Sequence, residues 1–300
     1  MSVIWGIPYL LIRIAVAEIS PATLVFARTG IATAILLPIA LLRTDFRAVL
    51  RRWRWVVAFA VVEIGVPWVF LGSAEQHVSS SLAGLLVAGV PLVGTVIAVV
   101  TGSRHRVGAT GLLGLLVGLV GVAAIIGVNL GSADTTALLQ IGVVVIGYAL
   151  GPAILSRRLA GLSSVGVMAF ALSLCALVYA PVAAFELPAA VPSPGALVSI
   201  AILGSVCTAA AFVLFSVLIE EIGPVRSTVI TYVNPAVAAL LGVAILNESF
   251  TPAMAAGFGL VILGSALATR PARAGTADAR NRAGPAESRQ LEAGADEPAL

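Results

Sequence analysis

Charged residues are scarce in this sequence. They form 10% of its 300 residues, whereas 60% are hydrophobic, and the mean hydropathy is +1.09. Soluble domains contain about 25% charged residues, and a chain with so few could not bury its apolar surface in water. A helix of about 20 apolar residues crosses a hydrocarbon core of about 30 Å, and such runs recur along the chain. The sequence therefore predicts an all-α integral membrane protein.

Lysine is absent, and cysteine and histidine occur only twice each. Cys175 and Cys207 both fall within apolar runs, which favours small buried side chains over a disulfide or a zinc site. All 17 basic residues are arginines, and most stand at expected helix ends. They indicate membrane orientation rather than a nucleic-acid partner. The linkers contain no Walker motif or glycine-rich phosphate loop, so we expect no cofactor and no ATP-driven transport.

One long segment occurs twice in altered form. Residues 82–102, LAGLLVAGVPLVGTVIAVVTG, recur as residues 228–247, TVITYVNPAVAALLGVAILN, at an offset of 144 residues. Each copy has one proline near its middle, Pro91 and Pro235. A repeat of this length predicts two copies of one multi-helix unit. Because proline frees a carbonyl of the preceding helical turn, both prolines are candidate helix hinges.

Ten membrane helices are expected, five in each repeat. The first has 16 residues, which is short for a span, and we therefore expect the natural chain to start further upstream. The helices are expected over residues 2–17, 21–42, 55–73, 78–101, 108–128, 137–156, 165–185, 196–219, 225–246 and 252–269. The predicted organisation is a first repeat over 1–128, a second over 137–269 and a tail over 270–300, whose polar composition favours disorder.

Local signals support particular helices and their packing. Ser20 and Pro21 are typical of an N-cap and the first helical position. Glu248 lies at the junction after the ninth expected helix, where it is expected to serve as a helix N-terminal charge or cap partner. The fifth helix carries a face of small residues, which predicts close packing against another helix. That face consists of Gly111, Gly114, Gly118 and Gly121.

The distribution of charge predicts the orientation. Five crossings place the start of the second repeat on the opposite side of the membrane, which makes the two repeats inverted. The linkers and tail expected on one side carry 15 arginines, and the loops expected on the other side carry none. Those loops instead hold Glu18, Glu75, Asp134, Glu186 and Glu248. The positive-inside rule then predicts that both termini are cytoplasmic.

Short motifs near the two ends of the chain resemble a known family. Trp5-Gly6, then Ile19-Ser20-Pro21 followed by Arg28, are similar to the opening of an EamA repeat of the drug/metabolite transporter (DMT) superfamily. Pro235, Asn247-Glu248 and the stretch 257–264 resemble the close of a second repeat. The resemblance implies a secondary carrier of small metabolites in the inner (plasma) membrane, often an exporter. Ser103-Arg104 departs from the acidic residue that the family pattern places after the fourth helix.

Glu63 is the first candidate for a transport residue. It lies nine residues beyond Arg54, or about 13 Å into the membrane. An ionisable side chain at that depth is costly and is functional by default. Glu63 could bind a cationic group or carry a proton. The alternative is a protonated or hydrogen-bonded glutamate that packs its helix against a neighbour.

Other candidates lie within the same predicted spans. Arg28 and Arg13 stand about 10 Å and 6 Å below the outer ends of their helices, where each could hold an anionic substrate, pair with Glu63 or snorkel to the interface. Further candidates could line a midplane cavity or serve as ordinary core residues. These are Trp68, Tyr148, Tyr232 and Asn234.

Three classes of function were compared on the sequence. A secondary transporter for a small-molecule substrate fits best, with proton coupling and a homodimer both compatible with it. A membrane-embedded enzyme would require a metal-ligand cluster or a nucleophile set within the apolar runs, and neither occurs. A sensor or scaffold would call for a folded soluble domain, but the longest polar segment is the tail.

Overall fold

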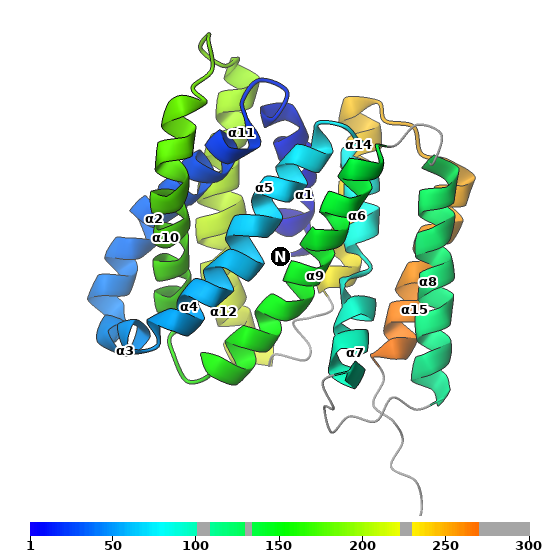
Figure 1. The fold of residues 1–300 in the computed structure, drawn as a ribbon, viewed down its shortest axis with the longest axis horizontal. Coiled ribbons are helices and arrows are strands. Elements are labelled where there is room, and N and C mark those ends of the chain that lie inside the picture. Colours follow the sequence, from blue (N-terminus) through cyan, green and yellow to red (C-terminus); the bar gives the residue numbers. More distant parts are fainter. Residues whose placement is uncertain (101–108, 130–133, 223–229, 270–300) are drawn as a thin grey trace, which may run out of the picture.

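The chain is a bundle of helices (Figure 1), described by a computed structural model over residues 1–100, 109–129, 134–222 and 230–269. The expected tail, the junction at Ser103-Arg104 and His105 lie outside the described residues. The helices are α1 (Ser2–Ala15), α2 (Pro21–Arg43), α3 (Phe46–Arg51), α4 (Trp53–Phe59), η1 (Ala60–Gly65), α5 (Val66–Glu75), α6 (Ser80–Val87), α7 (Val90–Val100), α8 (Ala109–Asn129), α9 (Thr135–Arg158), α10 (Ser164–Phe185), α11 (Pro194–Gly204), η2 (Ser205–Ala210), α12 (Ala211–Ile222), α14 (Ile230–Leu246) and α15 (Pro252–Ala268).

Within the described part of the chain, seven helices are long and apolar enough to cross a membrane. Three of the seven are composite segments made of consecutive helices: Trp53–Glu75, Ser80–Val100 and Pro194–Leu218. Three shorter apolar helices accompany them, Ser2–Ala15, Val233–Leu246 and Pro252–Ala268. The predicted all-helical fold is therefore confirmed for the described residues, and the length and apolarity of the helices are consistent with a membrane setting.

The third expected helix is longer than the sequence indicated. It begins at Trp53 and ends at Glu75 instead of running from Trp55 to Ser73, and the short helix α3 precedes it. The placement of Glu75 in a polar loop is therefore wrong. Glu75 is the last residue of α5 and is fully buried, because its helix continues past the small residues that suggested a turn.

Two of the spans contain a π-helical turn. η1 begins at Ala60 and η2 begins at Ser205, 145 residues later. The fourth residue is Glu63 in η1 and Thr208 in η2. A π-helical turn is rare and occurs frequently at functional sites, which makes both positions candidates for a functional role.

Glycines allow α8 and α15 to pack closely along their length, at the right of Figure 1. A Cβ added to Gly114 would overlap the backbone around Gly264, and one added to Gly121 would overlap the backbone at Gly257. All four glycines of the predicted face, which also includes Gly111 and Gly118, are buried. The predicted packing face on the fifth helix is confirmed, since only residues without a Cβ permit this approach of two backbones.

The predicted hinge prolines lie in different backbone settings. The fourth span is interrupted at Ala88 and Gly89, between α6 and α7, just before Pro91. Pro235 instead lies inside the continuous helix α14. Their role as hinges stays a prediction.

Polar bridges at one end of the bundle join segments that are distant in the sequence. The Glu248 carboxylate accepts hydrogen bonds from the backbone N–H groups of Ser80 and Ser81, both at 2.8 Å, and from their hydroxyl groups. Glu248 thereby caps α6, which confirms its predicted place at a helix N-terminus. In the same way the Glu18 carboxylate accepts from the N–H and the hydroxyl of Ser193, the N-cap of α11. These bonds lower the pKa of Glu18.

Candidate functional site

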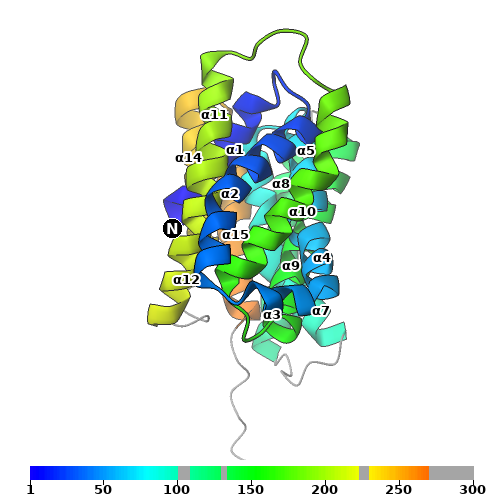
Figure 2. The ribbon, with the colours of Figure 1, turned by 90° about the vertical axis from the view of Figure 1, so that its left-hand side faces the viewer.

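Arg28 lies at the centre of a buried polar cluster. Helix α2, which Ser20 caps and Pro21 begins as predicted, lies between α10 and the α11–η2–α12 span (Figure 2). The Arg28 side chain is only 7% exposed, so it does not snorkel to the interface. Its guanidinium carbon lies 3.6 Å from the centre of the Trp68 ring, and its Nε donates a 2.8 Å hydrogen bond to the Thr208 hydroxyl. Ring contact and hydrogen bonding both stabilise a buried cation.

Tyr148, on α9, connects Arg28 with Glu63. Its hydroxyl lies within hydrogen-bonding reach of Trp68, and it interacts electrostatically with Glu63, Arg28 and Glu75. The arrangement therefore brings together four of the residues predicted from the sequence. They come from three spans: Arg28 from α2, Glu63 and Trp68 from Trp53–Glu75, and Tyr148 from α9.

The Glu63 carboxyl group is held against helix α9. A Cβ added at Gly151 would overlap it, so only a glycine at this position leaves the carboxyl its space. Glu63 is half-buried, its Oε2 is buried, and no described residue donates a hydrogen bond to that oxygen. Burying a carboxyl oxygen without a partner is unfavourable. Oε2 therefore takes no part in a structural hydrogen bond with the described residues.

Glu75 and Tyr9 extend the cluster toward the end of the bundle where Glu18 and Glu248 lie. Neither carboxylate oxygen of Glu75 has a hydrogen-bond partner among the described residues, and Glu75 interacts electrostatically with Glu248, Arg13 and Arg28. Tyr9 is buried on α1 and interacts with Tyr148, Glu75 and Arg28. Polar groups that influence one another electrostatically are therefore distributed from η1 toward this end of the bundle.

The remaining candidates lie elsewhere or use other contacts. Arg13 donates a hydrogen bond to the backbone oxygen of Glu75 rather than to Glu63. Asn234 lies on α14 beside Gly6 of α1, where a Cβ added to Gly6 would sit 2.9 Å from the Asn234 backbone oxygen. The side chain of Tyr232 lies outside the described residues. His77 is exposed at the end of the third span.

Sequence reasoning missed Thr208, Glu75 and Tyr9. Thr208 could have been found by applying the repeat offset to Glu63, since a shift of 145 residues rather than 144 leads to it. Glu75 lies two residues beyond the end expected for the third helix, at Ser73, so the sequence predicts a loop position for it. Tyr9 offered no signal beyond a polar atom in an apolar helix. Within the described residues, no group of three or more His, Cys, Asp or Glu side chains could hold a metal ion.

Comparison with known proteins identifies the family. The model of the EamA-like transporter family matches the chain twice, over residues 1–127 and 135–270. The chain belongs to the EamA-like transporter family. Membership places the chain among transporters that work in a membrane, in agreement with the apolar helices of the structure. It also confirms the resemblance that the motifs around Trp5 and Asn247 indicated.

Individual relatives of this EamA-like chain cover most of its length. The inner membrane transporter YedA of Escherichia coli (strain K12) is 29% identical over 276 residues, which is 90% of this chain and 88% of YedA. A transporter of Archaeoglobus fulgidus is 24% identical over 277 residues, 89% of this chain and 95% of the relative. A solved crystal structure with 22% identity superposes with a TM-score of 0.62 and covers 89% of this chain and 96% of its own. That last likeness concerns the fold alone.

Proposed function

We propose that this member of the EamA-like transporter family is a secondary active transporter that exports small metabolites or drug-like solutes across the inner membrane by alternating access. The observation that carries the proposal is the cluster of buried Arg28 and Trp68 with half-buried Tyr148 and Glu63, which combines a cation, a carboxyl group and two aromatic rings inside a bundle of apolar helices. Ionisable groups at such depth mark substrate or proton pathways.

The pairing of helices supports ten spans arranged as two inverted repeats. Numbered as ten spans, the second packs against the seventh (α2 with α10) and the fifth against the tenth (α8 with α15). The third span packs against the sixth (α5 with α9), as the eighth packs against the first (α11 with α1). The fourth packs against the sixth (α7 with α9), as the ninth packs against the first (α14 with α1). Exchanging the halves reproduces this pattern, as a pseudo-two-fold axis requires.

Arg28 and Glu63 take complementary roles in the proposed mechanism. The Arg28 guanidinium, held by the Trp68 ring and the Thr208 hydroxyl, receives an anionic group of the substrate. Glu63 exchanges a proton with the solvent on each side of the membrane, or binds a cationic group of the substrate, since its Oε2 has no hydrogen-bond partner among the described residues. Proton coupling would let the gradient across the inner membrane drive export. No cofactor and no enzymatic step are part of this mechanism.

Transport by inside-out membrane vesicles tests the proposal. The vesicles would be supplied with an extract of ¹³C-labelled cell metabolites under an imposed proton gradient, and the accumulated solutes identified by mass spectrometry. We expect at least one solute to accumulate with the parent protein but not with Arg28→Gln at equal membrane abundance. Arg47→Gln, which removes an exposed arginine far from the cluster, is the matched control and should transport normally. If no solute distinguishes vesicles with the protein from vesicles without it, the proposal is wrong.

A further inference from the structure

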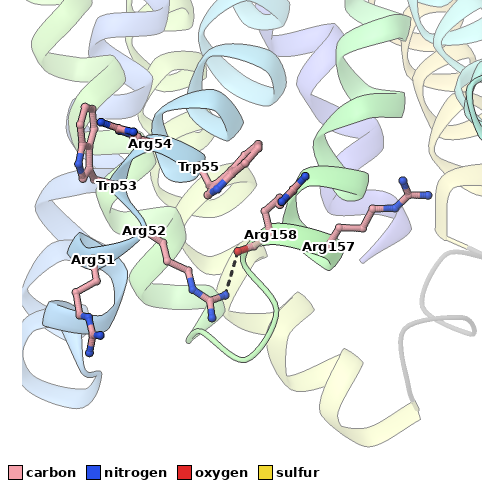
Figure 3. A pocket seen from close by; sticks show the side chains of 7 residues that line it. All are labelled: Arg51, Arg52, Trp53, Arg54, Trp55, Arg157 and Arg158. Carbon is pink, nitrogen blue, oxygen red and sulfur yellow. Dashed lines mark hydrogen bonds between the residues drawn. The ribbon is translucent and has the colours of Figure 1, made fainter. Parts of the chain in front are cut away.

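A cavity of about 620 Å³ lies at the arginine-rich end of the bundle, between the start of the third span and the end of α9. Figure 3 shows side chains from both segments around it. Five of its seven lining residues are arginines, and the other two are tryptophans. The lining consists of Arg51, Arg52, Trp53, Arg54, Trp55, Arg157 and Arg158. No carboxylate is among them.

Contacts between the two segments fix the shape of this cavity. Arg52 donates hydrogen bonds from Nη1 to the backbone oxygens of Arg158 at 3.0 Å and Ala160 at 3.1 Å. The Arg158 guanidinium carbon lies 4.4 Å from the centre of the Trp55 ring, on the other segment. Within the third span, the Arg54 guanidinium carbon lies 5.7 Å from the centre of the Trp53 ring. The Arg52 and Arg158 side chains therefore each contact the other segment.

The charge of the cavity calls for an anion. All five arginines that line it are exposed and carry charge of the same sign, and the structure gives no carboxylate partner to any of them in the described part of the chain. Arginine is well suited to phosphate, because its planar fork donates two parallel hydrogen bonds to two oxygens. A phosphate group placed among these arginines would balance their like charges. It would also accept hydrogen bonds from the guanidinium N–H groups that do not already bond to carbonyl oxygens.

The position of the cavity favours a lipid as the source of that phosphate. The spans Trp53–Glu75 and Thr135–Arg158 begin and end at the cavity, so it lies where the apolar core meets water. Trp53 and Trp55 are 52% and 40% exposed, and exposed tryptophans at the ends of spans lie at the level of lipid headgroups. Basic pockets between membrane helices bind phosphorylated headgroups.

We propose that this cavity binds the phosphate headgroup of an anionic phospholipid, in the inner leaflet if the orientation proposed above holds. The lipid would join the span that carries Glu63 to α9, which carries Tyr148 and Gly151. Because Glu63 packs against Gly151, a lipid that holds these two segments together would also stabilise the geometry of the polar cluster. Binding itself does not depend on the proposed transport activity and can be measured without it.

Native mass spectrometry of the full chain in detergent tests the proposal, with phosphatidylglycerol, cardiolipin and phosphatidylcholine as separate probes. We expect the two anionic lipids to bind and phosphatidylcholine not to bind. Arg157→Gln/Arg158→Gln should weaken anionic-lipid binding by about tenfold or more, since each arginine near an anionic surface contributes about fivefold. Arg51→Gln/Arg54→Gln, on the opposite side of the cavity, should weaken anionic-lipid binding to a similar extent. This second variant keeps the proposal testable if the first one fails to fold.

The control is Arg43→Gln/Arg47→Gln, which removes two exposed arginines near the same end without touching the cavity. It should bind anionic lipid as the parent does. If this control weakens anionic-lipid binding as much as the cavity variants do, binding depends on the general surface charge, and the proposed site is wrong. Displacement of the lipid by inorganic phosphate at a concentration equal to that of the lipid would also overturn it, because the cavity would then prefer a free anion to a headgroup.

Discussion

Glu63 and Thr208 occupy the same position, the fourth residue, in the two π-helical turns of the bundle. The two positions are chemically different. The Oε2 of Glu63 has no hydrogen-bond partner among the described residues, whereas Thr208 accepts a hydrogen bond from the buried Arg28. If the two turns are equivalent in an inverted repeat, the repeat places a proton or cation acceptor in one half and an arginine anchor in the other.

Thr208→Val tests the arginine anchor. Valine keeps the shape of threonine but removes the acceptor for Arg28 Nε, and the loss of a hydrogen bond to a buried charge costs about 1.5–3 kcal/mol. We expect lower transport and a lower melting temperature. Thr208→Ser restores the hydroxyl and should recover most of both. Parent-like transport by Thr208→Val would show that the contact is dispensable.

Glu63→Gln tests the proton site. Glutamine keeps the size and most of the hydrogen-bonding capacity of glutamate but cannot titrate. We expect the variant to reach the membrane normally and to lose net transport driven by a proton gradient. Exchange of labelled for unlabelled substrate at equal concentrations needs no net proton movement and should survive better. Net transport equal to that of the parent at every pH tested would make Glu63 a structural residue.

Gly151→Ala tests the position of the Glu63 carboxyl group without altering that group. The added methyl would overlap the carboxyl, so either Glu63 or α9 must move. We expect a loss of gradient-driven transport similar to that of Glu63→Gln, measured at equal membrane abundance. Gly142→Ala on the same helix places its methyl in open space and should leave transport unchanged. A defect in both variants would point to a general sensitivity of α9 instead.

Reporter fusions test the orientation. The 15-to-0 division of arginines between the two sides predicts that a fusion after Thr269 reads cytoplasmic and that one within residues 187–195 reads external. Alkaline phosphatase and green fluorescent protein fused at each point give opposite signals. An external reading after Thr269 would reverse the proposed topology and would place the arginine cavity in the outer leaflet.

The residues that sequence reasoning located correctly are those with a strong local signal. Apolar run length located the spans to within a few residues, Ser20-Pro21 marked the start of α2, and the spacing of glycines identified the face of α8 that packs on α15. Glu63 could be singled out because a carboxyl group within an apolar run is costly wherever that run folds. Each of these inferences depends on composition or on helical periodicity alone.

The contacts that form the cluster depend on tertiary packing and could not be read in this way. The π-helical turns have no sequence signature here: AVVEIG and SVCTAA share little beyond small apolar residues. The contact of Arg28 with Thr208 joins residues 180 positions apart. Glu75 resembled a loop residue because helix ends are the least certain part of a sequence-based assignment. The helix ends at Glu75 rather than at Ser73, and this difference of two residues places the carboxyl group inside the bundle instead of in a loop.

Glu248→Gln tests a structural contact outside the proposed transport site. The two oxygens of the Glu248 carboxylate accept from two backbone N–H groups and two hydroxyls at the start of α6. Glutamine offers only one acceptor oxygen, and its amide group would face donors. Loss of a charged N-terminal cap partner should destabilise the protein by about 2 kcal/mol, observed as a lower melting temperature in detergent. Glu221→Gln removes an exposed carboxylate on α12 and is the matched control.

Because this contact lies outside the proposed transport site, we expect Glu248→Gln to have a smaller effect on transport than on stability once membrane abundance is equalised. A melting temperature equal to that of Glu221→Gln would mean that the serine hydroxyls and water satisfy this helix end without the carboxylate.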